Sequence, residues 1–165
     1  TLLFLDEYET FMSYLVEDIN KFIRECQREN KIPCVRLNGT SDIQWEHQEY
    51  KDKTVFEMFP DVIFYDYTKI PTRKVEGITN YHLTWSYSEA NEKYSKLFDK
   101  VPNNKAVVFR NFLPSMFKDV KVIDGDEHDM RFLDEPNVVV GLKAKGKAIK
   151  DYSGFVIDLI EARAV

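Results

Sequence analysis

The sequence has few cysteines, and this scarcity excludes several classes of site. Only Cys26 and Cys34 occur among the 165 residues, and they lack the spacing of a zinc or iron–sulfur centre. Cys26 falls in an apolar helical pattern and Cys34 at the start of an apolar strand, so we expect both to be small core residues in a reducing compartment. We therefore expect no metal site and no resident cofactor in this chain.

Long apolar runs are absent as well. No stretch approaches the ~20 residues that a bilayer-spanning helix requires, and no secretory signal is visible. From these two absences we expect no association with a membrane and a cytoplasmic location.

Basic residues and glycines are too few for the usual nucleic-acid and nucleotide signatures. The formal net charge is −5, with 23 Lys and Arg against 28 Asp and Glu. This balance argues against direct nucleic-acid binding, although a local basic strip stays open. The six glycines form neither a Walker loop nor a GxGxxG motif.

The chain does have enough apolar and aromatic surface to build a core. Hydrophobic residues make up 44% of it and aromatic residues 14%, and 165 residues suit one compact α/β domain over residues 1–165. Because the chain begins with Thr1 and not with Met, we expect that an upstream segment of a longer protein is missing.

A long helix is expected near the start of the chain. Apolar residues between Tyr8 and Cys26 recur at intervals of three and four, which is the spacing of one helix face. Asp6 is the expected N-cap with Glu9 as its reciprocal partner, and Asn30 is the expected stop.

Short apolar and β-branched runs predict the strands of a sheet. We expect strands at residues 33–37, 62–65, 81–85, 106–109, 120–123 and 137–142, and a strand or short helix at 155–160. A polar loop to about Lys53, a short helix at 54–59 and a helix at 89–98 lie between them. Helices between apolar strands indicate right-handed βαβ crossovers. The expected fold is α/β, with a mostly parallel sheet of five or six strands, crossover helices and an open or partial (β/α) barrel.

Several of these strands end in bursts of polar residues. In parallel α/β sheets the ligand site lies at the carboxyl ends of the strands, so we expect these bursts to gather into one rim. The candidate rim residues are Asn38, Thr40, Ser41, Asp42, Asp66, Lys69, Ser86, Glu89, Asp126, His128 and Arg131.

The first two bursts each have a competing interpretation. The loop at 38–42 can cradle a phosphate or carboxylate with its backbone N–H groups, or it can be an ordinary turn followed by a cap. Asp61, Asp66 and Lys69 superficially suit a metal-dependent nuclease. However, Asp61 and Asp66 lie roughly 15 Å apart at the two ends of one expected strand, so we prefer a carboxylate and a cation that face a ligand.

The later bursts are equally open. The cluster at 124–131 surrounds His128 with carboxylates that can supply an acid, a base or a metal ligand. The alternative is a solvated acidic loop in which Arg131 neutralises Asp126 or Asp134. Beyond it, Lys143, Lys145 and Lys147 alternate along the chain. On an extended segment they would share one face and either engage phosphate groups or protect an exposed edge strand.

Several segments are also familiar as a set. They are VRLNGTSD with Trp45-Glu46, FPD running into FYDYTK, NYHLT with Ser86 and Ser88-Glu89, and DGDEHDMRFLD with VVGLKAKG. Together, over residues from about 34 to 158, this set resembles the phage gene-product-eighty-eight-like proteins, a family of phages and mobile elements.

The resemblance implies a parallel α/β fold and a phage or mobile-element origin inside a host cell. In such proteins a cysteine-rich segment with a Cys-Tyr-Ala step often precedes a long helix, an arrangement reminiscent of a partial radical-SAM barrel. This chain has no such segment. An iron–sulfur cluster and SAM are therefore expected only if a cysteine-rich segment exists upstream.

Two functional hypotheses follow from these observations. In the first, the rim binds a small polar or phosphorylated ligand, with Asp66, Lys69 and His128 as the catalytic candidates if a reaction follows. Arg131 would neutralise ligand charge, and Lys143 and Lys145 join the ligand-binding set. In the second, the protein is a non-enzymatic, anti-CRISPR-like phage inhibitor that binds a host defence nuclease through an acidic surface.

Overall fold

The computed structural model describes residues 2–159. These residues fall into two compact units. Unit 1 contains the chain up to Asp66 together with Arg73–His82, and unit 2 contains Tyr67–Thr72 and the chain from Leu83 onward. Strands β4 (Ile63–Thr68) and β5 (Tyr81–Ser86) contribute residues to both units.

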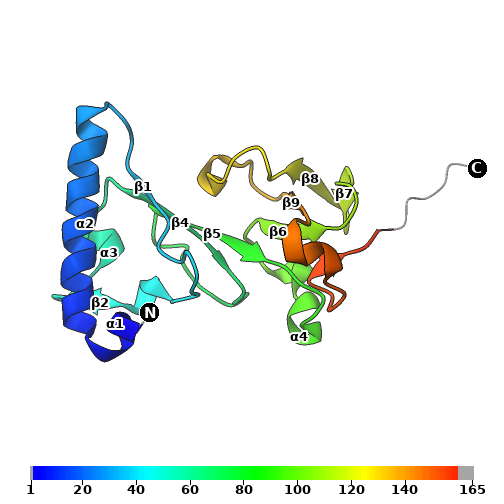
Figure 1. Cartoon of the computed structure of the whole chain (residues 1–165), viewed down its shortest axis with the longest axis horizontal. Helices are drawn as coiled ribbons and strands as arrows, with labels where there is room; N and C mark the ends of the chain where they lie inside the picture. The colour runs from blue at the N-terminus through cyan, green and yellow to red at the C-terminus, as the bar shows by residue number, and fades with distance from the viewer. Residues whose placement is uncertain (1, 160–165) are drawn as a thin grey trace, which may run out of the picture. The chain divides into compact units, whose positions relative to one another are not determined.

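Unit 1 begins with two helices, α1 (Leu2–Asp6) and α2 (Tyr8–Arg28). The long blue helix in Figure 1 is α2, and it confirms the helix expected from the apolar spacing. Its buried residues Met12, Ile19 and Cys26 lie seven positions apart, which places them on one face. No helix within residues 2–159 combines the length and the apolarity that crossing a bilayer requires.

The two ends of α2 give different results. The expectation that Asp6 caps the helix is wrong, because Asp6 already belongs to α1 and the N-cap position falls to Glu7, which makes no side-chain capping hydrogen bond. At the other end Asn30 has a left-handed φ of 54°. The amide of Lys31 there donates to the carbonyl of Cys26 over 2.8 Å. This is a Schellman ending, so Asn30 stops the helix as expected.

Strand β1 (Cys34–Val35) is shorter than expected and pairs in parallel with the start of β4. In contrast, β4 runs on to Thr68, so Asp66 lies inside the strand and not beyond its end. The apolar run at 62–65 is typical of a strand buried on both faces, but β4 is fully buried on one face only. Phe64, Asp66 and Thr68 are buried, whereas the residues between them are half-buried. One face of β4 is therefore fully covered, and that face carries a carboxylate.

The stretch expected to be a polar loop contains structure of its own. It holds the 3-10 turn η1 (Trp45–His47) and an antiparallel hairpin of β2 (Glu49–Tyr50) and β3 (Lys53–Thr54). The short helix that follows is confirmed as α3 (Val55–Met58). Thr54 and Glu57 cap it reciprocally, which satisfies two amides at its start.

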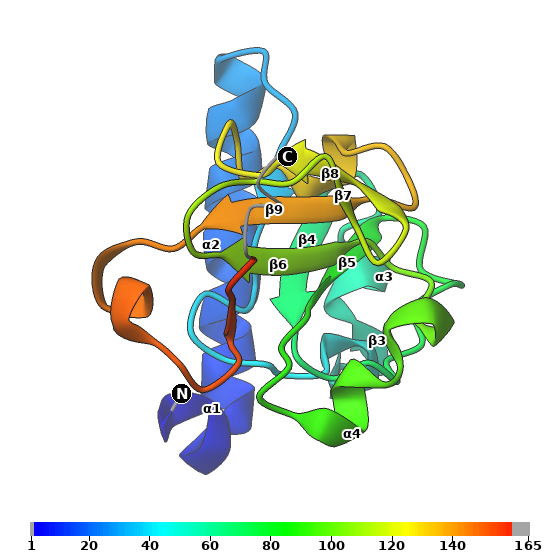
Figure 2. The same ribbon diagram turned by 90° about the vertical axis from the view of Figure 1, so that its right-hand side faces the viewer.

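The sheet of unit 2 is mostly parallel, as Figure 2 shows for β6, β9 and β8. Its strands are the end of β5, β6 (Lys105–Phe109), β7 (Met116–Phe117), β8 (Val120–Asp124), β9 (Val139–Lys143) and β10 (Val156–Ile157). Neighbours pair in the order β5-β6-β9-β8-β7, with β10 also on β6, and β7 is antiparallel to β8. The mostly parallel α/β class is thus confirmed, and the pairings of residues 2–159 close no barrel.

The crossovers contain less helix than expected. In place of a helix at 89–98 the structure has the single turn α4 (Glu92–Ser95) followed by η2 (Phe98–Lys100). The hairpin of β7 and β8 lies between β6 and β9 in the chain. The element expected at 155–160 is β10, and residue 160 lies outside the described residues.

Strand β6 shares one of its edges between two strands. Trp85 and Ser86 at the end of β5 pair with the first residues of β6, whereas β10 pairs with Val108 and Phe109 at its end. β10 therefore takes over the edge of β6 at the point where β5 stops. The core of unit 2 is rich in aromatic side chains. Within it the rings of Trp85 and Tyr87 meet edge to face, with 5.5 Å between their centroids.

Strand β9 is an interior strand, because it pairs with β6 on one side and with β8 on the other. The interpretation of its lysines as edge protection is therefore wrong for Lys143. Strand β9 ends at Lys143, and Lys147 lies in the 3-10 turn η4 (Gly146–Lys150). The three alternating lysines consequently do not share the face of one strand.

Replacing Gly141 in β9 with Ala should lower the free energy of unfolding by about 1–3 kcal/mol. The added Cβ would lie 2.7 Å from Cγ1 of Val122 and 3.0 Å from Cδ2 of Leu113, so the packed neighbours would have to move. Gly39→Ala is the matched control, because a Cβ at Gly39 meets nothing within 4 Å. Chemical denaturation followed by circular dichroism measures both variants. Equal losses of stability would contradict this account of the packing.

Candidate functional site

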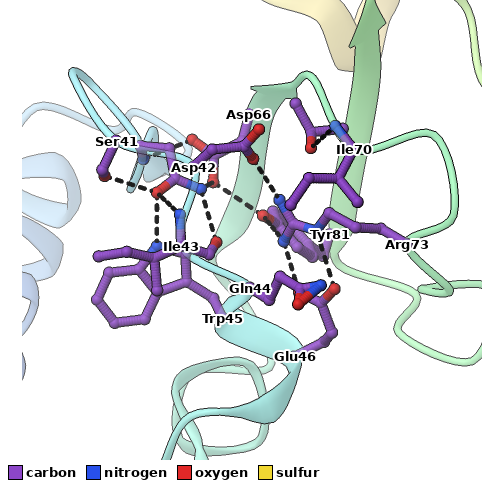
Figure 3. A network of polar contacts seen from close by, with 12 residues as sticks. Ser41, Asp42, Ile43, Gln44, Trp45, Glu46, Asp66, Ile70, Arg73 and Tyr81 are labelled. Carbon is purple, nitrogen blue, oxygen red and sulfur yellow. Dashed lines mark hydrogen bonds and ion pairs between the residues drawn. The ribbon is translucent and has the colours of Figure 1, made fainter. Parts of the chain in front are cut away.

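In unit 1 the predicted residues Asn38 and Asp66 meet in a buried polar network. Figure 3 shows this network around Asp66, Arg73 and Tyr81. Asp66 is fully buried, and its carboxylate accepts three hydrogen bonds. The backbone amide of Asn38 donates over 2.6 Å, the side-chain amide of Asn38 over 3.3 Å and the hydroxyl of Tyr81 over 2.9 Å. Asp66 lies inside β4, and its oxygens bind groups of the protein itself.

Burial also changes the proton affinity of this carboxyl group. Desolvation raises the pKa of Asp66 to about 6, while the hydrogen bonds from Asn38 and Tyr81 and the positive charge of Arg73 act in the opposite direction. Burial and the neighbouring Asp66 also raise the pKa of Tyr81 well above its usual value. At neutral pH Asp66 is therefore ionised and Tyr81 is a hydrogen-bond donor.

The loop after β1 folds around the side chain of Asn38. Its Oδ1 accepts hydrogen bonds from the Ser41 hydroxyl at 2.8 Å, the Ile43 amide at 2.9 Å and the Trp45 indole at 3.2 Å. A Cβ at Gly39 would meet nothing within 4 Å, so glycine is not needed for a close approach. This geometry matches the turn interpretation of the loop, in which Thr40 is exposed and Ser41 is half-buried.

Arg73 completes the network, although no motif or spacing in the sequence indicated it. Its guanidinium binds both carboxylate oxygens of Glu46, one of them over 2.9 Å, and it reaches Asp42 over 3.3 Å. It also donates to the hydroxyl of Tyr81 over 2.9 Å. The side chains of Arg73 and Glu46 are almost completely buried. The network is thus a set of internally paired charges that fixes the loop at 38–46.

In unit 2 the acidic segment at 124–134 is also folded on itself. Arg131 lies buried 3.3 Å from Asp134 and donates to the carbonyl and the imidazole Nδ1 of His128. Asp126 instead binds Lys145 over 2.8 Å and accepts the amide of Lys143. Of the two alternatives for Arg131, the structure has the pair with Asp134.

The electrostatics of this segment follow from those pairs. Burial raises the pKa of Asp134 in spite of Arg131 and His128, whereas the hydrogen bond from Lys145 lowers the pKa of Asp126. Within residues 2–159 no three His, Cys, Asp or Glu side chains form a group that could hold a metal ion. The segment therefore offers ion pairs between protein groups.

A pocket of about 320 Å³ lies at the carboxyl end of β5 in unit 2. It contains the predicted residues Lys69 and Ser86. The full lining is Lys69, Trp85, Ser86, Ser88, Ala90, Asn91, Tyr94 and Phe155. Its volume is at the lower end of the range of small-ligand sites.

The polar groups of this pocket differ in how they are used. The Ser88 hydroxyl donates to the carbonyl of Gly154 and accepts the amide of Ala90. The carbonyl oxygen of the Asn91 side chain caps α4 by accepting the amide of Tyr94. Glu89, another predicted residue, is exposed beside the pocket and lies 3.7 Å from Lys118.

The predicted residues thus form local groups in each unit. Unit 1 brings together Asn38, Ser41, Asp42 and Asp66. Unit 2 brings Lys69 to Ser86, His128 to Arg131, and Asp126 to Lys143 and Lys145. The aromatic lining of the pocket was missed, because Tyr94 and Phe155 carry no motif and reach the site only through the fold. That these groups form one common rim stays a prediction.

Asp66→Asn should remove a pH dependence from the stability of the protein. With a pKa near 6 when folded and about 3.9 when unfolded, Asp66 stabilises the fold most when it is protonated. This contribution is lost as the pH rises from about 4 to about 6. Over this pH range the free energy of unfolding of the wild type should fall by on the order of 2–3 kcal/mol relative to that of Asp66→Asn.

Urea denaturation at several pH values between 4 and 7 measures this difference. Asp61→Asn is the matched control, because Asp61 is exposed at the other end of the same segment, and it should keep the wild-type pH profile. Parallel profiles for wild type and Asp66→Asn would contradict the pKa assignment.

Arg73→Lys should lower the free energy of unfolding by about 3 kcal/mol. An ammonium group has three N–H donors and cannot replace the four contacts that the guanidinium makes to Glu46, Asp42 and Tyr81, so a buried carboxylate loses part of its pairing. Arg28→Lys, at an exposed position of α2, makes the same chemical change at the surface. Thermal and urea denaturation should separate the two variants, and equal stabilities would show that the network contributes little.

Comparison with known proteins supports the family that the sequence resembles. No curated protein and no solved structure matches the chain. A model of the family described as Gene product 88 matches residues 1–159, which is almost the entire chain. The likeness to a partial radical-SAM barrel gains no support from this match, whereas the expected family does. The chain belongs to the Gene product 88 family.

Proposed function

We propose that the protein binds a small ligand that carries a planar aromatic ring and an anionic group. The binding site is the pocket at the carboxyl end of β5. The observation that carries this proposal is the composition of one pocket, where aromatic side chains, hydroxyls, an amide and a lysine line the same 320 Å³. Nucleoside monophosphates combine the required ring and anion, so they are the probes of choice.

The apolar part of the ligand would be bound by aromatic contacts. Trp85 is almost fully buried and forms one wall of the pocket. Tyr94 in α4 and Phe155, which directly precedes β10, contribute half-buried rings. Aromatic rings stabilise stacked or edge-on partners by about 0.5–1.5 kcal/mol beyond the area that they bury. Three such rings around a small space favour a flat ligand over an aliphatic one.

The polar part of the ligand would be bound at the rim of the same space. Lys69 supplies a positive charge, and Ser86 and Asn91 supply a hydroxyl and an amide. A charged donor is worth more than a neutral one, because a hydrogen bond to an ion contributes about 1.5–3 kcal/mol. The charge of Lys69 therefore favours an anionic group over a neutral one.

The position of the pocket agrees with a general rule of parallel sheets. Ligands of open α/β folds lie beyond the carboxyl ends of strands, at places where neighbouring strands diverge. Here β5 ends at Ser86 and β10 takes its place beside β6. Catalysis by Asp66 or His128 and inhibition of a host nuclease through an acidic surface are further hypotheses, and the proposal does not depend on either.

Proton–nitrogen correlation spectra test the proposal directly, because the chain has only two tryptophans. Adenosine monophosphate should shift the indole signal of Trp85. The signal of Trp45 should stay in place, because that indole lies in unit 1 and donates to Asn38. Adenosine alone and inorganic phosphate alone separate the contribution of the ring from that of the anion.

Lys69→Gln should weaken the binding of adenosine monophosphate roughly tenfold and leave the binding of adenosine unchanged. Lys100→Gln is the control, since Lys100 is exposed and lies outside the pocket lining. If all four common nucleoside monophosphates at millimolar concentration leave the Trp85 signal unmoved, the proposed ligand class is wrong.

A further inference from the structure

One wall of the pocket belongs to a segment with few contacts of its own. Residues 144–155, here called the strap, run from the end of β9 to the start of β10. The turn η4 within the strap has no buried residue. Ile149 is 51% exposed and Tyr152 is 80% exposed. A segment that buries so little apolar surface opens locally at a low free-energy cost.

The C-terminal end of the strap nevertheless forms part of the pocket wall. Phe155 lines the pocket, and the carbonyl of Gly154 accepts hydrogen bonds from the amide of Glu89 and the hydroxyl of Ser88. Gly154 has a left-handed φ of 96°, and a Cβ there would lie 2.8 Å from the backbone nitrogen of Ala90. The strap thus meets the chain beyond β5 at a close backbone contact.

A single side chain ties the exposed middle of the strap to the sheet. Arg110, directly after β6, donates to the carbonyls of Ile149 and Asp151. Its guanidinium lies 4.2 Å from the ring centroid of Tyr152 and 2.9 Å from the carboxylate of Asp158, just after β10. Only 10% of the Arg110 side chain is exposed. One guanidinium therefore contacts three residues of the strap and one residue that follows β10.

We propose that the strap opens and closes over the ligand pocket and that Arg110 is the latch that holds it closed. This inference rests on the proposed ligand binding of the pocket. The two ends of the strap are fixed, because the amide of Ala144 donates to the carbonyl of Phe109 and β10 pairs with β6. Opening is therefore a movement of residues 145–155 between these anchors, which releases the carbonyl of Gly154 from Glu89 and Ser88 and takes Phe155 out of the pocket. Arg110 acts on the ligand only through the strap, as a positioning residue.

Arg110→Lys tests the latch, because an ammonium cannot bind two carbonyls and a carboxylate and also stack on Tyr152. Hydrogen exchange at the amides of Ala148 and Asp151, which are bonded within the strap, should accelerate roughly tenfold. The amide of Val140 in the interior of β9 should exchange as in wild type. Lys150→Ala, an exposed change in the strap itself, should have no effect.

Access to the pocket is measured without any ligand. Acrylamide quenching of tryptophan fluorescence should rise about twofold in Arg110→Lys, because an open strap uncovers Trp85. A Trp45→Phe background isolates the signal of Trp85. If Arg110→Lys fails to fold, Tyr152→Leu removes only the stacking contact at an exposed position and should act in the same direction.

The outcomes separate this inference from the proposed function. Unchanged exchange in the strap overturns the latch, and faster exchange with unchanged quenching of Trp85 overturns the closure of the pocket. If adenosine monophosphate binds, its dissociation should be several times faster in Arg110→Lys, and equal rates overturn the gating. If it does not bind while both ligand-free effects appear, the strap stands and the proposed ligand class falls.

Discussion

Unit 1 depends on the burial of one carboxylate in the middle of a strand. An ionised carboxylate away from water is very costly unless donors replace its hydration, and Asp66 obtains them from Asn38 and Tyr81. These donors must be held in place in turn. Tyr81 is fixed by Arg73, and the side chain of Asn38 is fixed by the loop that it organises. The loop after β1 is therefore a consequence of the charge in β4.

The elements that sequence reasoning predicted correctly are those whose signal is local. The apolar spacing of α2 and the left-handed Asn30 are local features, as are the apolar runs of β5, β6 and β9. Both hairpins were missed for a definite reason. Their two-residue turns are Lys51-Asp52 and Lys118-Asp119, all with φ between 48° and 62°. Such turns usually contain Asn-Gly or Asp-Gly, so a Lys-Asp pair gives no warning.

The candidate sites were harder to predict, because they depend on contacts between distant segments. Asp66 was placed beyond its strand, although the alternation of Phe64, Asp66 and Thr68 on one face is visible in the sequence and could have placed it inside. No spacing relates Arg73 to Glu46, which lie 27 residues apart. The pocket likewise brings Phe155 to Ser86 only because two strands share one edge of β6.

That shared edge explains why a pocket and a movable segment occur together in unit 2. A strand that ends beside a longer neighbour leaves backbone groups of the neighbour unpaired, and a buried sheet does not tolerate this. β10 pairs with the backbone groups of β6 that β5 leaves unpaired. The chain reaches β10 from β9 through a connection that passes the end of β5. The space at this junction is the pocket, and the connection is the strap. Because Arg110 directly follows β6, the strand that creates the junction also leads into the residue whose side chain binds the strap.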